Sequence, residues 1–365
     1  MRDHFDLAVF LISLCGVAML HSGAAARADQ PLRAGIIGLD TSHVPAFTKT
    51  LNNPDASGDL ADVQVVAAFP GGSPDIPSSA DRLEGFTSQL RDMGVEIVDT
   101  IDALLDKVDV VLLESVDGRP HLEQARPVIL AGKPLFIDKP VAGSLSDAIA
   151  IFRLAAQHNV PCFSSSSLRF SPGIAGMRDS DTVGDVIGCA AFGPCPTEPH
   201  HPDLFWYGVH GVEILFTIMG PGCESVSRVH TDGVDLVTGV WSDGRIGSFR
   251  GIRQGKSDYG ALVFGSKAIE RSGGYAGYEP LVEAIATFLR PANRRFQPTR
   301  RSSCSPSWRR PTRANAATAP PCRSATSSTR RRPRRRRNVD HASAVAAAND
   351  LGASALRVSP QHEAR

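Results

Sequence analysis

A lysine and a proline close a short apolar segment at a place where an α/β protein would bind a ligand. Leu135–Asp138 is apolar up to its terminal acid, and Lys139 and Pro140 follow it directly. Ligands of doubly wound sheets bind in the crevice at the carboxyl ends of the strands. Because Pro140 fixes the backbone beyond the lysine, we expect the Lys139 ammonium to face that crevice. We therefore predict that Lys139 is a catalytic residue.

A histidine and an acid offer a second chemical group. His210 and Glu213 are three residues apart on a predicted helix and therefore share one of its faces. The Glu213 carboxylate would fix the tautomer of the imidazole and favour its charged form, whereas a nearby Lys139 ammonium would favour the neutral form. A neutral His210 could accept a hydroxyl proton as hydride leaves the adjacent carbon, with Lys139 stabilising the alkoxide. The alternative is a structural histidine bonded to Glu213 in the core.

The loop after the first predicted strand departs from a dinucleotide-binding fingerprint. That fingerprint has three glycines, for the turn, for close approach of the pyrophosphate and for helix packing. Counted from Gly38, the three positions hold Gly38, Asp40 and His43. A carboxylate at Asp40 would place negative charge and a Cβ where the backbone should contact the diphosphate. The other interpretation is that Asp40 or Ser42 caps the helix that follows.

A second feature of the fingerprint also differs. An acid at the end of the second strand normally binds the ribose hydroxyls, but Phe69 is followed by Pro70, Gly71 and Gly72. The two glycines could still admit a phosphate or an adenosine. These motifs alone leave dinucleotide binding open.

The sequence does not favour a metal site. His200, His201, His210 and Glu213 are the candidate ligands, but neighbouring histidines on a proline-flanked loop are more often solvated than ligating. Cysteine spacing gives no CxxC motif either, so zinc is not indicated. The main body has four cysteines, Cys162, Cys189, Cys195 and Cys223. Export of the protein, which the N-terminal segment described below predicts, would permit disulfides, and free thiols are equally compatible with the sequence.

The segments around these residues alternate between strand and helix from Leu32 to Ser166. Buried β-branched runs separated by helices are typical of a parallel sheet covered on both faces. We predict strands at residues 32–39, 63–69, 96–98, 108–114, 135–138 and 160–164. Helices are predicted from about Pro45 and at residues 81–93, 101–105, 121–131 and 145–157.

Beyond Arg169 the pattern changes to longer alternating strands joined by turns, which is typical of antiparallel hairpins. We predict strands at residues 182–192, 225–231, 235–241, 246–252 and 261–264, with helices at 205–219 and 279–289. The predicted fold class is α/β. A Rossmann-type doubly wound parallel sheet in residues 29–166 is followed by an α+β domain with an open, mostly antiparallel sheet in residues 167–290.

The two ends of the chain differ from this body. In residues 1–28 a short apolar run leads to a small-residue cleavage pattern, which predicts a Sec-type signal peptide and an exported, periplasmic or extracellular protein. Residues 291–365 form an Arg/Pro/Ser/Ala-rich tail that we expect to be disordered and that has the composition of an out-of-frame translation. Fifteen arginines and no acid lie between residues 291 and 337, so the rest of the chain is acidic although the formal net charge is +1. An acidic body does not favour nucleic acid or a membrane surface as a partner.

Three features together resemble the Gfo/Idh/MocA oxidoreductases, the group of glucose–fructose oxidoreductase and inositol dehydrogenase. They are the glycines of the first strand, the segment 136–140 and the segment 208–213. The resemblance covers about residues 32–290 and implies a Rossmann domain followed by a sheet domain, often with oligomerisation through that sheet. It also implies NAD or NADP as the cofactor and a sugar-like alcohol as the substrate.

The family motifs assign roles to individual residues. Asp138, Lys139 and Pro140 match a Glu-Lys-Pro motif whose lysine lies beside the nicotinamide and the substrate. His210 matches the histidine of an Asp-x-Gly-x-His-x-x-Asp signature, and Glu213 matches its last acid, while a tryptophan replaces its first acid. A further histidine, after the fourth strand, matches one that commonly faces the cofactor.

The complete predicted site follows from these assignments. The catalytic residues are Lys139 and His210, and the substrate-positioning residues are Asp138, His121, Glu213 and Tyr207. The cofactor-binding residues are Gly35, Gly38, Asp40, Ser42, His43, Gly71, Gly72 and Pro140.

Three classes of function remain at this point. The first is an exported NAD(P)-dependent oxidoreductase on a sugar or polyol, forming a homo-oligomer through its second sheet. The second is an exported carbohydrate-binding or isomerase- or lyase-like protein with an impaired cofactor site. The third, an arginine-rich nucleic-acid binder, depends entirely on the tail.

Overall fold

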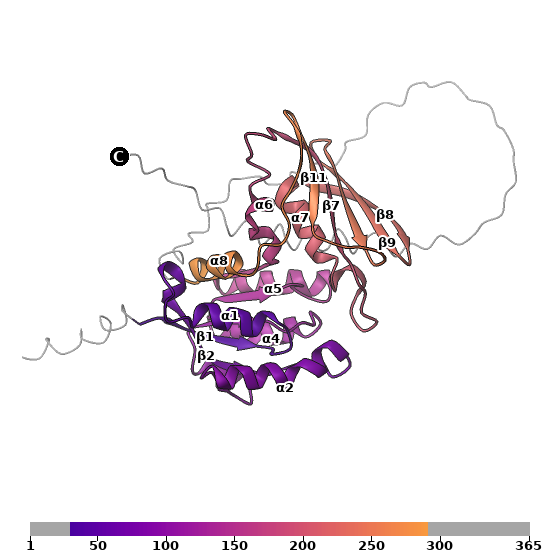
Figure 1. Cartoon of the computed structure of the whole chain (residues 1–365). Coiled ribbons are helices and arrows are strands. Elements are labelled where there is room, and N and C mark those ends of the chain that lie inside the picture. The colour runs from indigo at the N-terminus through magenta and orange to yellow at the C-terminus, as the bar shows by residue number, and fades with distance from the viewer. Residues whose placement is uncertain (1–29, 291–365) are drawn as a thin grey trace, which may run out of the picture.

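The computed structural model describes residues 30–290, which fold around two six-stranded sheets (Figure 1). The predicted signal peptide, residues 1–28, and the predicted tail, residues 291–365, lie outside the described residues. Within residues 30–290, no helix has the length and apolar character needed to cross a membrane.

The first sheet is parallel throughout, in the order β3-β2-β1-β4-β5-β6. Its strands are β1 (Leu32–Ile37), β2 (Val63–Phe69), β3 (Glu96–Ile97), β4 (Val110–Leu113), β5 (Leu135–Asp138) and β6 (Cys162–Ser165). They are connected by η1 (Gly58–Asp62), α1 (His43–Leu51), α2 (Pro77–Asp92), α3 (Ile101–Leu105), α4 (His121–Leu130) and α5 (Leu145–Gln157). The order reverses between β1 and β4, so the predicted doubly wound sheet is confirmed.

The strands at the centre of this sheet are apolar because both of their faces are covered. Every residue of β4 and β5 is buried, as expected for parallel strands with helices on both sides. Side chains of β1 and β4 alternate between two cores. One core contains residues of α1 and α8 (Glu279–Leu289), and the other contains residues of α3, α4 and α5.

The second sheet has the order β12-β11-β7-β10-β9-β8, and only β7 and β10 pair in parallel. It therefore agrees with the prediction of an open, mostly antiparallel sheet. Its strands are β7 (Val186–Pro194), β8 (Cys223–Thr231), β9 (Val234–Trp241), β10 (Ile246–Ile252), β11 (Gly260–Gly265) and β12 (Ile269–Arg271). Two helical segments precede the second sheet in the chain, η2 (Ser167–Phe170) and α6 (Pro172–Ala175). Two more lie between β7 and β8, η3 (Asp203–Phe205) and α7 (Val209–Met219).

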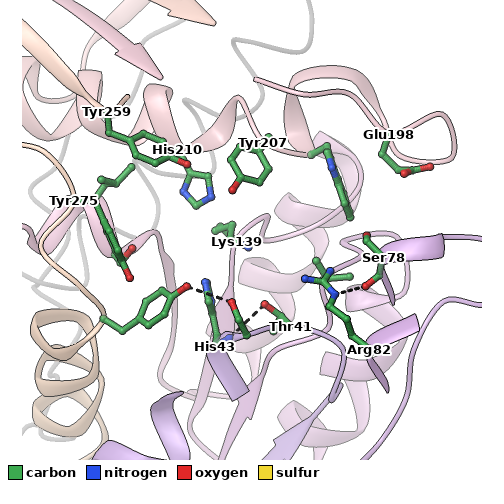
Figure 2. A pocket seen from close by; sticks show the side chains of 16 residues that line it. Thr41, His43, Ser78, Arg82, Lys139, Glu198, Tyr207, His210, Tyr259 and Tyr275 are labelled. Atoms are coloured by element: carbon green, nitrogen blue, oxygen red, sulfur yellow. Dashed lines mark hydrogen bonds between the residues drawn. The ribbon is translucent and has the colours of Figure 1, made fainter. Parts of the chain in front are cut away.

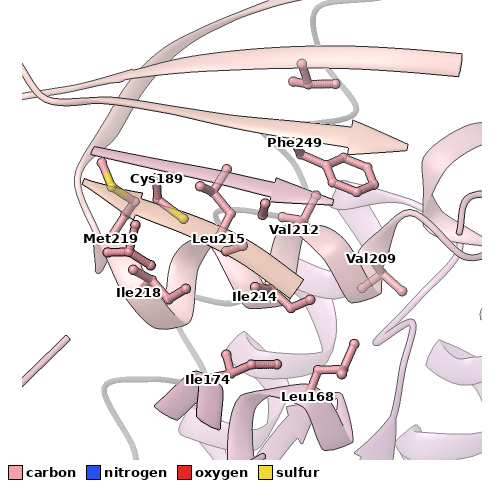
Figure 3. Close-up of a cluster of buried hydrophobic side chains, with 14 of the residues drawn as sticks. Leu168, Ile174, Cys189, Val209, Val212, Ile214, Leu215, Ile218, Met219 and Phe249 are labelled. Carbon is pink, nitrogen blue, oxygen red and sulfur yellow. The ribbon is translucent and has the colours of Figure 1, made fainter. Parts of the chain in front are cut away.

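Helix α7 covers one face of this second sheet and carries the predicted catalytic histidine. Figure 3 shows Val212, Leu215 and Met219 of α7 packed beside Phe249 and Cys189 of the sheet. All of these side chains are buried. The helix was predicted to begin at residue 205, but a short η3 turn comes first and the α-helix starts four residues later.

Helix α8 corrects the predicted division of the chain. Residues 279–289 were assigned to the second domain, but Leu281, Val282 and Ile285 are buried in the core formed by β1, β2 and α1. The chain therefore returns to the first domain after its last strand. Figure 1 shows this crossing, with α8 lying beside α1. The segment just before α8 consequently passes over the junction of the two domains.

Two glycines inside helices provide a matched test of the packing around α7. A Cβ on Gly211 of α7 would overlap the ring of Phe249, whereas a Cβ on Gly85 of α2 would meet no atom within 4 Å. Overpacking costs roughly 1–3 kcal/mol, and replacing an exposed helical glycine by alanine gains up to about 1 kcal/mol. We predict that Gly211→Ala lowers the free energy of unfolding in urea and that Gly85→Ala raises it slightly. Equal effects of the two changes would contradict the close contact between α7 and the sheet.

Candidate active site

A cavity of about 450 Å³ lies at the carboxyl edge of the first sheet, where the second domain meets it (Figure 2). The first domain contributes residues from α1, from α2 and from the loops after β1, β4 and β5, and the second contributes residues from α7, its preceding turn and the loop before α8. Lys139 and His210, the two predicted catalytic residues, both line this cavity. The structure therefore brings them to one site from different domains.

All four tyrosines of the 365-residue chain line this one cavity: Tyr207, Tyr259, Tyr275 and Tyr278. The Tyr278 hydroxyl lies 3.4 Å from Ser42 Oγ, which connects the loop before α8 to the start of α1. Aromatic rings with hydroxyl groups offer both a flat apolar surface and hydrogen bonds. Only Tyr207 was predicted from the sequence. The other three, Tyr259, Tyr275 and Tyr278, carry no sequence motif that marks them.

Lys139 is held by the acid that precedes it. Its Nζ lies 3.2 Å from Asp138 Oδ2, and both side chains are almost completely buried. The peptide bond between Lys139 and Pro140 is cis. Burial alone would lower the pKa of Lys139, but the Asp138 carboxylate outweighs burial and raises that pKa. Lys139 is therefore a cation at neutral pH.

Asp138 also contacts a histidine on its other side. His43 Nδ1 lies 2.9 Å from Asp138 Oδ2 and 3.9 Å from Glu114 Oε2. Burial tends to raise the pKa of Asp138, yet His43 and Lys139 together hold it below its usual range. Asp138 was predicted to position the substrate; its carboxylate is instead buried beneath the cavity and shared between a lysine and a histidine.

Glu114 completes this buried cluster and was not identified from the sequence. It follows β4 directly, is fully buried, and neither of its carboxylate oxygens has a hydrogen-bond partner among the described residues. Burial, and then the neighbouring Asp138 charge, raise the pKa of Glu114 well above its usual value. Glu114 is therefore stabilised in its neutral, protonated form.

His210 faces the cavity in its neutral form. Its Nδ1 lies 2.8 Å from Ser166 Oγ, and its ring meets those of Tyr207 and Tyr259 edge to face. Burial lowers the pKa of His210 well below its usual value, and the Lys139 ammonium lowers it further. The predicted influence of lysine on the imidazole is therefore present.

Glu213 does not fix the tautomer of His210 as predicted. Its carboxylate accepts two hydrogen bonds from Arg169, at 2.9 and 3.0 Å, and one from Ser165 Oγ at 2.8 Å. The shared helix face was inferred correctly, but the end of β6 and the turn after it supply better donors to Glu213 than His210 does. Glu213 thus anchors α7 to the first domain, and the partner of His210 is Ser166.

His121 is also outside the cavity. It is fully buried, with Nε2 2.9 Å from the carbonyl of Ser115 and Nδ1 3.3 Å from the carbonyl of Val141. The ring therefore joins the loops that follow β4 and β5. The role of substrate positioning predicted for His121 is not supported by this placement.

The predicted cofactor loop has an arrangement that removes the conflict at Asp40. Asp40 is fully buried and accepts hydrogen bonds from the Val116 N–H at 2.9 Å and from Ser79 Oγ at 2.5 Å. Its charge is therefore turned away from the cavity, into the contacts between three loops. Gly38 has φ +87°, and a Cβ there would overlap Ser115, so only glycine fits at this turn.

The remaining glycines do not line the cavity. Gly35 packs against Leu104 and Val108 within β1, and Gly71 and Gly72 have positive φ values in the turn after β2. The first-domain end of the cavity is instead lined by Thr41, Ser42 and His43 at the start of α1 and by the Arg82 side chain of α2. A helix amino terminus with a nearby guanidinium suits phosphate groups, so these residues fit a dinucleotide.

The candidate metal ligands from the sequence do not converge. His201 Nε2 accepts a hydrogen bond from the Gly118 N–H at 3.2 Å, and His200 contacts Glu198. The Glu213 carboxylate accepts a hydrogen bond from Arg169. A different group, His43 with Glu114 and Asp138, places one potential ligand atom from each residue within 4.8 Å of the others.

Comparison with known proteins agrees with this fold. Residues 32–166 match the family model of the Gfo/Idh/MocA oxidoreductases, described as an oxidoreductase family with an NAD-binding Rossmann fold. No curated protein sequence matches the chain.

Solved structures resemble it over both domains. Scyllo-inositol dehydrogenase from Lactobacillus casei and UDP-N-acetylglucosamine 3-dehydrogenase from Acidithiobacillus ferrooxidans each have a TM-score of 0.56 and 16% identity, covering 71% of this chain and 87% or 88% of theirs. GenD2 from gentamicin A biosynthesis, solved in complex with NAD, has a TM-score of 0.53 and 17% identity over 67% of this chain and 72% of its own. At these identities the likeness establishes the shared fold.

The buried histidines predict that acid destabilises the protein. Burial lowers the pKa of His121 and His210, and it lowers that of His201 to about 4. Below about pH 6.5 the unfolded chain therefore binds up to three protons that the folded protein does not. The free energy of unfolding consequently decreases as the pH decreases. Glu114, with its raised pKa, binds a proton in the folded state first and opposes one of the three.

We predict that the free energy of unfolding, from urea titrations at pH 7, 6 and 5, falls as the pH falls. The slope is at most about 3 kcal/mol per pH unit. The unfolded chain binds a net two protons more than the folded protein, and each contributes roughly 1.4 kcal/mol per pH unit. His201→Gln should make the slope shallower, while His158→Gln, an exposed control, should leave it unchanged. Constant or rising stability between pH 7 and pH 5 would mean that these histidines are not held neutral.

Proposed function

Because residues 32–166 match the family model of the Gfo/Idh/MocA oxidoreductases, we propose that the chain belongs to this family and is an NAD(P)-dependent oxidoreductase acting on a sugar or polyol. The observation that carries this proposal is the single cavity shared by Lys139 and His210. One group is a cation fixed by the first domain, and the other is a neutral imidazole fixed by the second. An alcohol oxidation needs both, a charge for the developing alkoxide and a base for its proton.

The cofactor end of the cavity is compatible with the dinucleotide. The start of α1 and Arg82 offer donors and positive charge to its phosphates, while Asp40 keeps its charge out of the cavity. When bound, the nicotinamide ring supplies the acceptor or donor of the hydride.

The chain's own residues then handle the proton. The Lys139 ammonium, fixed 3.2 Å from Asp138, stabilises negative charge on the substrate oxygen. Ser166 contacts Nδ1 of His210, which leaves Nε2 turned to the cavity to accept the hydroxyl proton. The low pKa of His210, caused first by burial and then by Lys139, keeps that nitrogen free for the proton at neutral pH.

The substrate class is inferred from the walls of the cavity. Four tyrosines and Trp206 provide flat rings and hydroxyl donors, which suit a ring bearing many hydroxyl groups. Two similar structures are named as dehydrogenases of an inositol and of a nucleotide sugar, which supports a cyclic polyol or a sugar here.

Cofactor binding separates this proposal from its non-redox alternative. We predict that NADH or NADPH, titrated into the purified full chain, gains nicotinamide fluorescence and saturates. Arg82→Gln should weaken this binding, because it removes the cation at the phosphate end, and Arg153→Gln, remote on α5, should not. No saturation at millimolar cofactor would instead favour a carbohydrate-binding or isomerase-like protein.

Turnover tests the two catalytic residues. With a panel of inositols and aldoses as substrates, Lys139→Met and His210→Asn should each lower kcat/KM by on the order of 10²–10⁴-fold. The fluorescence titration should change little in His210→Asn, because His210 acts on the substrate. Lys139 is expected beside the nicotinamide as well, so both variants are assayed at saturating cofactor. Variants that keep full activity would remove the assignment of these residues.

A second part of the proposal concerns self-association through the second sheet. Of the eleven large hydrophobic side chains exposed within residues 30–290, eight belong to this sheet. Phe264, Gly188, Ile246 and Val240 are consecutive neighbours across four strands, on the face opposite α7. An exposed apolar face of this extent suits burial against another protein surface, and a second copy of the chain presents the same face.

Light scattering provides a controlled test of this association. Ile246 on the sheet is 57% exposed and Leu130 on α4 is 56% exposed, so the two side chains are matched in exposure. We predict an oligomer for the unmodified chain and for Leu130→Lys, and dissociation for Ile246→Lys. A monomeric unmodified chain, or dissociation by both variants alike, would rule out an interface on this sheet.

A further inference from the structure

His43 stands at the third glycine position of the dinucleotide loop, yet its side chain is built into the site. It is the first residue of α1, it lines the cavity, and its ring stacks against Phe47 and meets Tyr278 edge to face at 4.6 Å. Only 6% of the residue is exposed. A glycine, which serves helix packing at this position, has been replaced by a titratable group in contact with the cavity.

The two ring nitrogens of His43 face different surroundings. Nδ1 is buried and lies 2.9 Å from Asp138 Oδ2, which is ion-pair distance, although neither atom makes a hydrogen bond among the described residues. The opposite edge of the ring, with Nε2, is therefore the edge available to the cavity. A carboxylate this close to Nδ1 favours the tautomer in which Nδ1 carries the proton and Nε2 keeps its lone pair. The acid that orients a histidine base occupies the same side of the ring.

The groups around His43 fit this arrangement. Asp138, at the end of β5, offers Oδ2 to both His43 and the ammonium of the next residue, Lys139. Glu114, directly after β4, lies 3.9 Å from His43 Nδ1. Tyr278 covers the ring from the loop before α8, and His210 of α7 faces the same cavity from the other domain. In Figure 2 the Lys139 side chain lies between the two histidines.

We propose that His43 and Asp138 form a second acid–base dyad in this cavity, independent of His210. His43 Nε2 accepts a proton from a substrate hydroxyl: the O–H bond breaks, an N–H bond forms, and the electron pair remains on oxygen beside the Lys139 ammonium. Asp138 stabilises the resulting imidazolium. The reverse transfer returns the proton. Two bases on either side of one lysine allow proton transfer at two hydroxyls of a polyol, and this part of the inference rests on the proposed function.

The dyad itself can be tested without any substrate. In the full chain labelled with ¹⁵N-histidine, NMR should show one histidine whose proton resides on Nδ1 and is shifted strongly downfield by a carboxylate. That signal should vanish in His43→Gln and in Asp138→Asn, and it should persist in His158→Gln, the exposed control. A signal that survives Asp138→Asn, or a His43 protonated on Nε2, would overturn the dyad.

A bound cation is the competing explanation of the same residues. His43, Glu114 and Asp138 could together ligate a divalent ion. Elemental analysis of the protein used for NMR decides between the two. We expect no stoichiometric metal. One equivalent of a divalent cation that is lost in Glu114→Gln would overturn the dyad and assign the cluster to a metal centre.

Catalysis is tested by chemical rescue. With an inositol or aldose that the unmodified chain oxidises, His43→Ala should lower kcat by on the order of 10²–10⁴-fold, measured at saturating cofactor because His43 also lies at the start of α1. Added imidazole should restore part of the rate, which a structural role would not allow. His43→Gln, closer in volume, serves if the alanine variant unfolds. Full activity in either variant, or a loss that imidazole does not restore, overturns the catalytic role while leaving the NMR result on the dyad to stand alone.

Discussion

One buried carboxylate organises the centre of this protein. Asp138 Oδ2 contacts the Lys139 ammonium at 3.2 Å and His43 at 2.9 Å, in a place without solvent exposure. An isolated charge there would be expensive, and removing one partner of a buried pair costs several kcal/mol. The charge is retained because it holds a cation and an imidazole at the edge of a cavity. Neutral Glu114 and neutral His210 around it limit the net charge that must be buried.

The fold supplies this arrangement through two crossings of the chain. Strand β5 of the parallel sheet ends at Asp138, with Lys139 directly after it, and the second domain brings α7 with His210 to this carboxyl edge of the sheet. Glu213 fixes the crossing through two hydrogen bonds from Arg169. The chain then comes back as α8, and Tyr275 and Tyr278 on the way close the cavity over α1. The site therefore depends on both domains, and neither contains it alone.

The alternating pattern of apolar runs was enough to predict both sheets, since burial on two faces leaves a clear signal in β4 and β5. Lys139 and His210 were predicted because strand ends and short motifs mark them locally. Contacts between distant segments were not predictable in this way. Glu213 was paired with the wrong partner because helix spacing says nothing about Arg169, and Glu114 resembled an ordinary strand end. The tyrosines after β10, Tyr259, Tyr275 and Tyr278, carry no motif, and α8 gives no local sign that it returns to the first domain.

The central claim is that Lys139 and His210 act on a substrate held beside a dinucleotide in one cavity. A crystal structure of the full chain with NADP⁺ or NAD⁺ tests it most directly. We expect the phosphates at the start of α1 near Arg82 and the nicotinamide ring within contact distance of Lys139, on the side that faces His210. A dinucleotide bound elsewhere, or a nicotinamide ring remote from both residues, would contradict it.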